Sequence, residues 1–390
     1  MSEVLPLVLR SGQVAQLKGD ETLVDVKFPS WDDDSHTFEG SFQKPYADLI
    51  KRNEWLGSNE FETFNHGITG NNLFCGAVMA PNGYMYLIPH AHTHVAKLDL
   101  SDDSIVNIGA NLGAGTFKFN GGCLASNGLI YCTPATHGKS IVIDPEANTV
   151  TEIGATYCTT SAQFATAVYN RNGKVYSAPV NRNSGLVINT SNDADYTVNF
   201  ATSNGAVPSC VPSHDDSNII CIARDSTKSL IWTTSNDALT QFVATHSADT
   251  SKWQRGALTP GGTVIVAPLT FNSIAHLILT PLGGAAKITS SDTGSLKFSG
   301  VCIGPDGFAY FSSRYYQGIF KVCTRTNVAQ WYASGFLINA SDPVDKWGAP
   351  RLAPNGFIYW PPLMDSRVVK IAVKGDVPPD FYLSRYVNYF

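Results

Sequence analysis

The sequence contains seven copies of a short turn signal at nearly constant spacing, and this repeat constrains the fold more than any other feature. Each copy is a dipeptide of turn-forming residues between two apolar runs. The copies are Asn82-Gly83, Asn127-Gly128, Asn172-Gly173, Ser217-Asn218, Gly261-Gly262, Asp306-Gly307 and Asn355-Gly356, at intervals of 45, 45, 45, 44, 45 and 49 residues. Asn-Gly and Asp-Gly favour the positive φ values of a type I′ turn, so the copies predict tight β-hairpins.

Three other positions keep a fixed distance from the turns. A tyrosine follows five of the seven turns by three residues, a proline follows five by six residues, and an aromatic residue precedes six by nine residues. They are Tyr86, Tyr131, Tyr176, Tyr310 and Tyr359; Pro89, Pro134, Pro179, Pro268 and Pro362; and Phe74, Phe119, Phe164, Trp253, Phe298 and Trp347. Proline cannot donate to a strand ladder, so it marks a strand end. We expect the recurrent aromatic residues to fill the gaps between units.

Each unit reads as four strands, most clearly in the second copy. Strands are predicted there at 122–126, 129–134, 140–144 and 149–154. Four antiparallel strands repeated about every 45 residues are typical of a β-propeller. Helical repeats of similar length would need apolar residues at a spacing of about 3.6 and few turn formers, whereas this chain has 33 glycines and 21 prolines. We therefore predict an all-β fold, a seven-bladed β-propeller over residues 71–390.

The ends of the ring can also be predicted from the spacing. The fourth copy is the weakest, because Ser217-Asn218 replaces Asn-Gly and Cys221 replaces the tyrosine. In the first copy the fourth strand ends near residue 110, which is 27 residues after the turn, and the same interval from Gly356 reaches residue 383. The last blade is thus predicted to be complete, with Phe381–Val387 as its outer strand and no strand exchanged at the closure.

Residues 1–70 lack the repeat, and they are predicted to form an attachment arm or linker, because the segment is short and polar for a core of its own. Within it, PLVLRSGQVAQLKGDETLVDV (6–26) resembles the N-terminal attachment segment of tailed-bacteriophage tail-fibre and virion proteins. The matching residues are Arg10, Gly12, Gln16, Leu17, Gly19, Asp20 and Leu23. The blades resemble a propeller repeat found in phage, bacterial and protozoan proteins of varied role, best kept in Ile141–Val150, which indicates fold and not function.

The most conspicuous candidate site is a run of alternating histidines in the loop between the second and third strands of the first unit. In an extended segment, His90, His92 and His94 would project to one side. Three imidazoles can hold zinc or another divalent cation. No carboxylate follows at a typical ligand spacing, so the alternative is an exposed polar loop tip.

A second candidate is a set of lysines placed immediately before the recurrent aromatic residue. They are Lys118, Lys252, Lys297 and Lys346. In a symmetric propeller these lysines would form one ring around the face that carries the strand two–three loops, and a ring of cations attracts anionic groups. The alternative is that they are solvated neighbours of packing aromatics.

A third candidate combines aromatic and polar residues on the same face. Its members are Arg314, Tyr315, Tyr316 and Gln317 in the loop of the sixth unit, the segment Lys252-Trp253-Gln254-Arg255, and the pair Lys346-Trp347. Aromatic faces beside hydrogen-bonding groups suit sugar rings and protein partners. Single exposed aromatic residues are otherwise common on protein surfaces.

Other function classes find little support. The net charge of −5 is not that of a nucleic-acid-binding protein, and no apolar run is long enough to insert into a membrane. None of the familiar hydrolase, metalloprotease or phosphate-loop motifs occurs. The carboxylate pairs Asp102-Asp103 and Asp215-Asp216 fall at predicted turns, where aspartate bonds the local backbone. The eight cysteines include no Cys-x-x-Cys pair and are predicted to be buried free thiols, with no resident cofactor.

The repeat and the resemblance together imply a structural protein of a phage virion. It would dock to other virion proteins through residues 1–30 and present a propeller face to a host-surface receptor, as a tail-fibre or receptor-binding protein does. Two alternatives stay open, a capsid or baseplate decoration protein and a propeller enzyme that acts on a glycan or lactone. The resemblance also implies a homo-oligomer located in the virion, although no heptad pattern supports one.

Overall fold

The structure is a computed structural model of the 390-residue chain. It describes residues 7–10, 13–16, 27–29, 39–41, 61–157, 161–200, 207–213, 215–241, 251–260, 262–270, 273–278, 284–289, 298–314, 318–324, 326–332 and 346–373. Within these ranges there is no helix of the length and hydropathy needed to cross a membrane.

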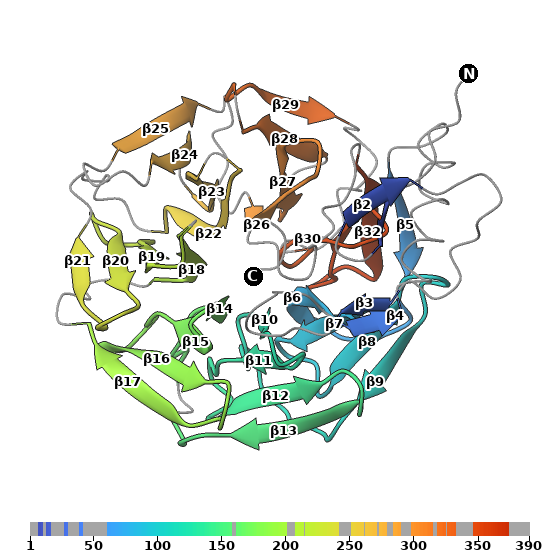
Figure 1. The fold of residues 1–390 in the computed structure, drawn as a ribbon, viewed down its shortest axis with the longest axis horizontal. Coiled ribbons are helices and arrows are strands. Elements are labelled where there is room, and N and C mark those ends of the chain that lie inside the picture. Colours follow the sequence, from blue (N-terminus) through green and yellow to red (C-terminus); the bar gives the residue numbers. More distant parts are fainter. Residues whose placement is uncertain are drawn as a thin grey trace.

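The chain folds as an all-β propeller with four-stranded antiparallel blades, and the sheets follow one another around a central axis (Figure 1). The described residues form seven four-stranded sheets, which are numbered here as blades in chain order. The innermost strands are β6 (Phe74–Met79), β10 (Cys123–Leu124), β14 (Val168–Asn170), β18 (Ser209–Pro212), β22 (Trp253–Leu258), β26 (Phe298–Ile303) and β30 (Arg351–Leu352). The second strands are β7 (Tyr84–Pro89), β11 (Ile130–Cys132), β15 (Lys174–Ser177), β19 (Asn218–Ile222), β23 (Val264–Pro268), β27 (Phe308–Ser313) and β31 (Phe357–Trp360).

The two outer positions of each blade complete the sheets. The third strands are β8 (Val95–Asp99), β12 (Ser140–Asp144), β16 (Ser184–Asn189), β20 (Leu230–Thr233), β24 (Ser273–Ile278), β28 (Ile319–Cys323) and β32 (Arg367–Ala372). The outermost strands are β9 (Ile105–Ile108), β13 (Thr149–Ile153), β17 (Asp195–Asn199), β21 (Leu239–Gln241), β25 (Gly284–Thr289), β29 (Ala329–Tyr332) and, in the seventh blade, β5 (Phe61–Asn65). The four strands predicted in the second copy are confirmed as β10 to β13.

The hairpin turns are not of the predicted type I′. Gly83 donates its N–H to Ala80 O at 3.1 Å and has a φ of 84°, whereas Asn82 has no positive φ. A type I′ turn needs positive φ at both central residues, so this is a type I turn followed by a left-handed glycine. Pro81 fixes the φ that the first central residue of a type I turn requires. The same bond and positive φ recur at Gly128, Gly173, Gly262, Gly307 and Gly356.

The turn of the fourth blade lies slightly earlier than Ser217-Asn218, the dipeptide that marks it in the sequence. Asp216 has the positive φ, 59°, and donates its N–H to Ser213 O at 3.1 Å. Aspartate enters the left-handed region more readily than most residues, so it replaces the usual glycine. Asp215 accepts the N–H of Ser217 at 3.1 Å, which confirms a turn-forming role for this carboxylate pair.

The recurrent tyrosine and the turn asparagine form a pair that joins neighbouring blades. Asn127 Nδ2 donates to Tyr131 Oη at 2.9 Å and to Thr190 O, in the third blade, at 3.0 Å. The Tyr131 hydroxyl donates to Asp193 Oδ1 at 2.8 Å, in the same turn as Thr190. In the first blade Asn82 and Tyr86 pair and both bond Pro145 O; the other pairs are Asn172 with Tyr176, Asn355 with Tyr359, and Asp306 with Tyr310. The repeat signature thus includes a polar link from one blade to the next.

The ring is closed by a strand from the N-terminal side, which corrects the prediction of an outer strand at Phe381–Val387. Strand β5 pairs antiparallel with β32, with Phe61 opposite Ile371 and Asn65 opposite Arg367. The seventh blade therefore contains three strands from the C-terminal part of the chain and one from the N-terminal part, and the propeller starts before residue 71. Residues 381–387 lie outside the described ranges.

An ion-pair cluster reinforces this closure. Lys370 Nζ, on β32, lies 3.1 Å from Glu62 Oε1 on β5 and 3.4 Å from Asp103 Oδ2 in the first blade. Burial raises the pKa of Asp103, and the Lys370 ammonium lowers it. One lysine therefore touches the closing strand and the two blades on either side of the closure.

Two short hairpins come from the N-terminal segment. Strand β1 (Leu7–Arg10) pairs with β2 (Gln13–Gln16), and β3 (Lys27–Pro29) pairs with β4 (Glu39–Ser41).

Seven cysteines are described and all are free thiols. Six are buried and Cys323 is partly exposed, so the prediction of buried free thiols is confirmed for those six.

Replacing Glu62 by proline should destabilise the protein by about 3 kcal/mol, because proline removes a ladder hydrogen bond of the closing strand. Glu62 is opposite Lys370, and His66 N–H bonds Ser366 O at 3.2 Å in the same register, so Glu62 is at a hydrogen-bonded position of the β5–β32 ladder. The matched control, Glu62→Ala, also loses the ion pair with Lys370 but keeps the backbone N–H, and should change the unfolding free energy by less than about 1 kcal/mol. Urea denaturation of the full chain measures both, and equal midpoints for the two variants would show that β5 does not hold the ring.

Tyr131→Phe should lower the free energy of unfolding by about 1 to 2 kcal/mol, because it removes a buried hydroxyl that bonds both Asn127 and Asp193. The control is Tyr196→Phe. Tyr196 also bonds a turn aspartate, Asp237, at 2.9 Å, but it is 38% exposed, so its loss should cost little. Similar losses in the two variants would contradict a special role for the recurrent pair.

Candidate functional site

The recurrent aromatic residues are core residues, as the packing interpretation predicts. All six are at most 3% exposed. Five of them lie directly across the hairpin from the recurrent proline: Phe74 and Pro89, Phe119 and Pro134, Phe164 and Pro179, Trp253 and Pro268, Trp347 and Pro362. The two repeat positions are therefore one cross-strand pair near the end of the hairpin.

The lysines that precede these aromatics are buried, so the predicted exposed ring of cations is wrong for the three that are described. Lys118, Lys252 and Lys346 are 2%, 0% and 2% exposed. Their carbonyls accept N–H groups that follow the second strand, as Lys118 O does from Ala135 at 2.8 Å. This backbone bonding draws the residue into the blade. Lys297 lies outside the described residues.

The Lys118 ammonium is used by the backbone. Its Nζ donates to Gly115 O at 2.8 Å and to Ala91 O at 2.9 Å, and it lies 3.4 Å from His92 O. Burial lowers the pKa of Lys118. The side chain therefore fastens the histidine loop to the connection between the first two blades.

The predicted aromatic and polar cluster is only partly present. Trp253 and Trp347 are 3% and 0% exposed, so they pack inside and do not face a partner. Arg314 is partly buried in the loop of the sixth blade. Tyr315, Tyr316 and Gln317 lie outside the described residues.

The three histidines of the first-blade loop do not converge on one point, which corrects the metal-site prediction. His92 Nε2 is 2.9 Å from Asn107 Oδ1, and His94 Nδ1 is 3.0 Å from Thr93 Oγ1. His90 turns inward and is 7% exposed. No group of three or more His, Cys, Asp or Glu side chains in the described part of the chain could hold a metal ion.

His90 is a neutral, buried imidazole. Its pKa is lowered to about 4, mainly by burial and also by the nearby cations Arg255, Arg314 and Lys118, while the Asn72 backbone raises it. Its Nδ1 is buried and has no hydrogen-bond partner. We assign the proton of the neutral ring to Nε2, the nitrogen that remains for the Asn72 backbone, and this tautomer leaves Nδ1 as an acceptor.

A single arginine reaches across the axis. In five of the six blades with the recurrent aromatic, the residue two positions later is small: Gly76, Gly121, Thr166, Gly300 and Ala349. In the fifth blade it is Arg255. Its Nη2 donates to Asn120 O at the entry to the second blade, and its Nη1 lies 3.2 Å from where a Cβ on Gly76 would be. The glycine at position 76 leaves room for the guanidinium.

The strands that carry Gly76 and Arg255 each have an irregular register with the next strand. The register of β6 with β7 shifts between Phe74 and Gly76, and that of β22 with β23 shifts between Trp253 and Gly256. Bulges redirect side chains. The shifted segments contain Cys75 and Arg255, whose side chains hydrogen-bond to each other.

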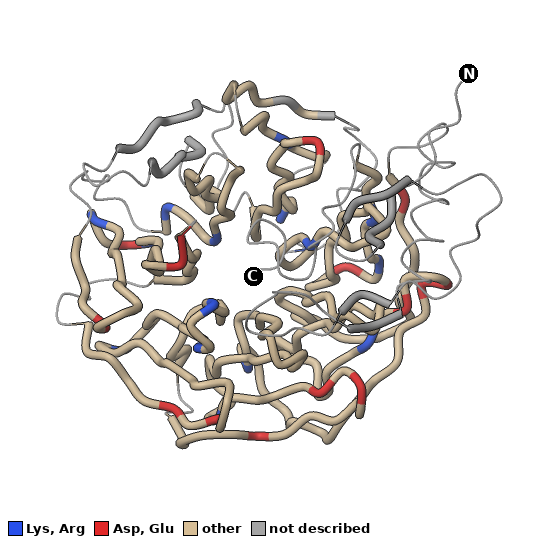
Figure 2. Tube along the Cα trace, viewed as in Figure 1, with Lys and Arg blue, Asp and Glu red and all other residues tan. Residues whose placement is uncertain are grey.

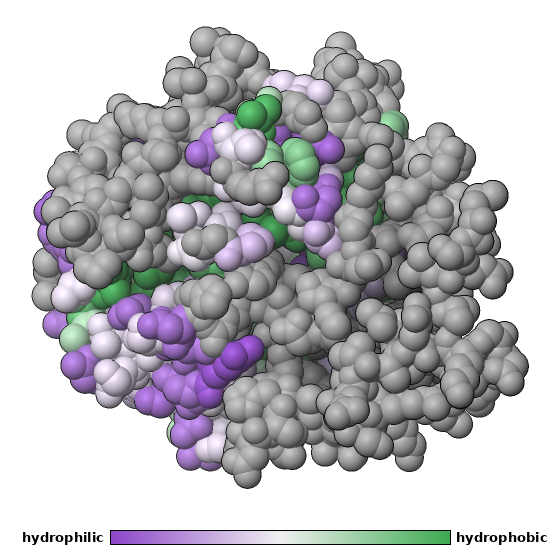
Figure 3. Space-filling model, turned by 45° about the horizontal axis from the view of Figure 1, so that its top comes forward, coloured by the Kyte–Doolittle hydropathy of each residue, from purple (hydrophilic) through white to green (hydrophobic). Residues whose placement is uncertain are grey.

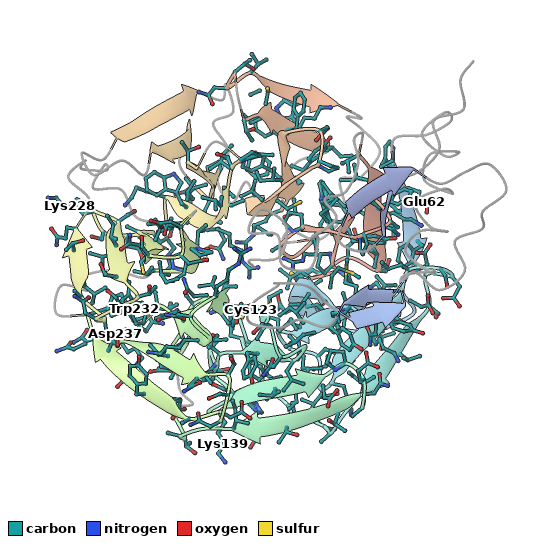
Figure 4. All side chains as sticks on the ribbon, viewed as in Figure 1. Glu62, Cys123, Lys139, Lys228, Trp232 and Asp237 are labelled. Carbon is teal, nitrogen blue, oxygen red and sulfur yellow. The ribbon has the colours of Figure 1, made fainter. Side chains whose placement is uncertain are left out.

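The axial region is rich in cations. Figure 2 shows lysine and arginine segments close to the central opening, while acidic segments lie mainly farther out. Burial lowers the pKa of Arg255, and no carboxylate in the described residues forms an ion pair with it. Arg351 is also fully buried, with a pKa lowered to about 10 by burial, near Cys123 and Cys302. Figure 4 labels Cys123 beside the axis.

Phe117 is an exposed aromatic residue beside His90. On the face drawn in Figure 3, the described surface is mainly hydrophilic, and green residues lie mostly in recesses. Phe117 is 51% exposed and has a φ of 60°, an unfavourable backbone for a bulky residue. Its ring meets the His90 ring edge-on at 4.3 Å between centroids. We define His90, Phe117, Lys118, Arg255 and Arg314 as the axial site.

The sequence indicated part of this site but not its geometry. His90, Lys118, Arg255 and Arg314 were all among the candidates, but they belonged to three separate candidate sites. The sequence signal that pointed to Arg255 is that it occupies a repeat position where the other blades have small residues. Phe117 carried no signal, because its importance depends on a left-handed backbone and on contact with His90.

The predicted docking residues are described only in part. Arg10 and Gln16 lie in the β1–β2 hairpin, where Arg10 is opposite Gln13 and Gln16 is opposite Leu7. Gly12, Leu17, Gly19, Asp20 and Leu23 lie outside the described residues.

Comparison with known proteins places the chain by fold. No protein-family model matches the sequence, and no curated protein sequence matches it. Virginiamycin B lyase from Staphylococcus aureus is similar in structure, with a TM-score of 0.66, 13% identity, and coverage of 80% of this chain and 99% of that one. A catalytically inactive histidine-to-alanine variant of that lyase with quinupristin matches with a TM-score of 0.65, 14% identity, and coverage of 81% and 100%.

A second structural relative has a different role. Hydrazine synthase from Kuenenia stuttgartiensis matches with a TM-score of 0.62, 13% identity, and coverage of 80% of this chain and 98% of that one. Identities this low establish the propeller fold and leave the activity open.

His90 should make stability depend on pH. Because its folded pKa lies below the usual 6.5, the unfolded state takes up the proton first. The contribution is full above pH 6.5 and is lost as the pH falls toward 4, by up to about 3 kcal/mol. We expect the unfolding free energy of the native chain to fall more than that of His90→Gln between pH 7 and pH 4.5 in urea denaturation. Parallel losses in both proteins would contradict a neutral buried imidazole.

Proposed function

We propose that the chain is a seven-bladed propeller that serves as a structural protein of a phage virion, of the tail-fibre or receptor-binding kind. Residues 1–30 attach it to other virion proteins, and the axial end of the propeller recognises a receptor on the host surface. Recognition is non-enzymatic in this proposal, and the protein works in the virion as a homo-oligomer.

The axial site is the observation that carries the recognition half of the proposal. Arg255, Arg314 and Lys118 come from three parts of the ring, and all three charges act on His90. Structure alone does not require a buried guanidinium at a repeat position where other blades use small residues. Such a charge is costly to bury, so a binding role explains its presence better than packing does.

The attachment half is supported by the N-terminal motif and by the chain's layout. Arg10 and Gln16 belong to a two-stranded sheet that shares no strand with the blades. The closing strand starts at Phe61. The first 30 residues are therefore not needed to complete any described blade, and they are available for contacts with another virion protein.

Two other functions have separate support. A capsid or baseplate decoration protein would use the same arm and need no receptor. An enzyme that acts on a glycan or lactone is favoured by His90, which is neutral at pH 7 and so available as a base, and by the likeness to a lyase. The three-histidine metal site does not form, so an enzyme here would work without that metal.

Deletion of residues 1–30 separates attachment from recognition. We expect the purified full chain to bind cells of the host strain and to block infection, because it occupies the receptor. The deletion variant should bind cells equally, since its blades are complete, but should be missing from virions. Binding is measured by cell sedimentation and incorporation by immunoblotting of purified particles.

The outcomes distinguish the functions. Incorporation of the full chain without any cell binding or block of infection would reject the receptor role in favour of decoration. Normal incorporation of the deletion variant would reject the attachment arm. Conversion of a cell-wall glycan by the purified chain, lost in His90→Gln, would establish the enzyme.

A further inference from the structure

We propose that the axial site binds an anionic sugar, a ring that carries a carboxylate or phosphate group near a free hydroxyl. This inference deepens the proposed receptor role by naming the class of ligand. It draws on three different groups at the site, a guanidinium, an imidazole acceptor and an exposed aromatic ring, each of which selects one part of the ligand.

The guanidinium selects the anion. Arg255 is 5% exposed, donates through Nη2 to Asn120 O and bonds the Cys75 side chain. A guanidinium has five N–H donors, and no other side chain in the described ranges takes them up. Arginine binds carboxylate and phosphate groups through paired donors. A ligand anion would therefore complete the hydrogen bonds of Arg255 and neutralise a charge that lacks a described carboxylate.

The imidazole selects the hydroxyl. His90 is more than nine-tenths buried, and its Nδ1 has no partner. An unsatisfied buried acceptor costs about 1 to 3 kcal/mol, so its persistence points to a ligand donor that satisfies it. Sugar hydroxyls donate to such an acceptor, whereas a simple anion such as acetate has no O–H to give when ionised.

The phenyl ring selects the sugar face. Phe117 is half exposed, and its ring packs against the His90 ring with 4.3 Å between the two centroids. Its left-handed backbone, with a φ of 60°, is the kind of strain that structures retain at binding sites. A sugar bound at this site would pack its C–H groups against the flat face of the ring, as aromatic residues do in apolar contacts.

Lys118 contributes positive charge beside the site and does not itself bond the ligand. Its ammonium is held by Gly115 O and Ala91 O, so it adds positive charge beside the site from a fixed position. Long-range attraction of this kind raises the local concentration of anionic ligands.

Calorimetric titration of the full-length protein with three probes tests the inference. The probes are glucuronate, glucose 6-phosphate and glucose, at constant ionic strength. We expect at least one anionic sugar to bind at least tenfold more tightly than glucose. The first two probes distinguish a carboxylate ligand from a phosphate ligand. Binding of glucose as tight as that of both anions, or no binding of any probe, would overturn the inference.

Variants locate the binding to the axis. Arg255→Gln should weaken binding of the preferred anionic sugar at least tenfold. Its matched control is Arg182→Gln, which removes an arginine stacked on Phe164 in the loop of the third blade, 4.6 Å from its ring centroid, and should leave affinity within twofold. Equal affinities of the two variants would place the binding elsewhere.

A second pair covers the case in which Arg255→Gln does not fold. Phe117→Asn removes the ring but keeps a residue that tolerates the left-handed backbone, and should weaken binding severalfold. Val106→Asn is the control, since Val106 is also 51% exposed but lies on the outer strand β9. Equal binding by both would overturn the stacking role. Loss of sugar binding in Phe117→Asn with cell adhesion unchanged would reject this ligand class and leave the receptor role standing.

Discussion

The joint between one blade and the next is the interaction on which the rest of the molecule depends. Neighbouring sheets share no ladder, so side chains must hold them together. The Asn127 amide and the Tyr131 hydroxyl satisfy each other and also bond the third blade. A buried hydroxyl without its partner would cost more than the bond adds. The pair must therefore occur as a unit, which is why the turn asparagine and the tyrosine recur together along the chain.

The same packing crowds the axis and gives the functional region its character. Inner strands converge there, and most repeats place glycine, alanine or threonine at the point of closest approach. A Cβ on Gly300 would lie 2.9 Å from the Ala349 side chain. Arg255 departs from this pattern and spans the axis to Asn120 O. Its charge is retained where packing favours small neutral residues, and it sits beside an imidazole whose Nδ1 has no partner.

Much of the fold was predictable because the repeat is local. A turn, a strand-ending proline and an inward aromatic residue are each encoded within about fifteen residues, so their period revealed the propeller and its four-stranded blades. Predictions failed where one residue changes the geometry. Three residues lie between the paired positions Ala80 and Tyr84, a loop length that favours a type I turn, and the fourth turn shifted to Asp216. The closing strand was missed because Phe61–Asn65 lies hundreds of residues from its partner β32, and nothing local specifies that pairing.

The sequence by itself determined the blade, because hairpin turns and alternating strands depend on neighbours along the chain. Only the tertiary structure decided which side chains meet. It buried Lys118, Lys252 and Lys346, separated His90 from His92 and His94, and brought Arg255 and Phe117 to His90 from different parts of the ring. The reason is physical: residues equivalent in the repeat become inequivalent once the ring closes, because each then faces a different partner across the axis.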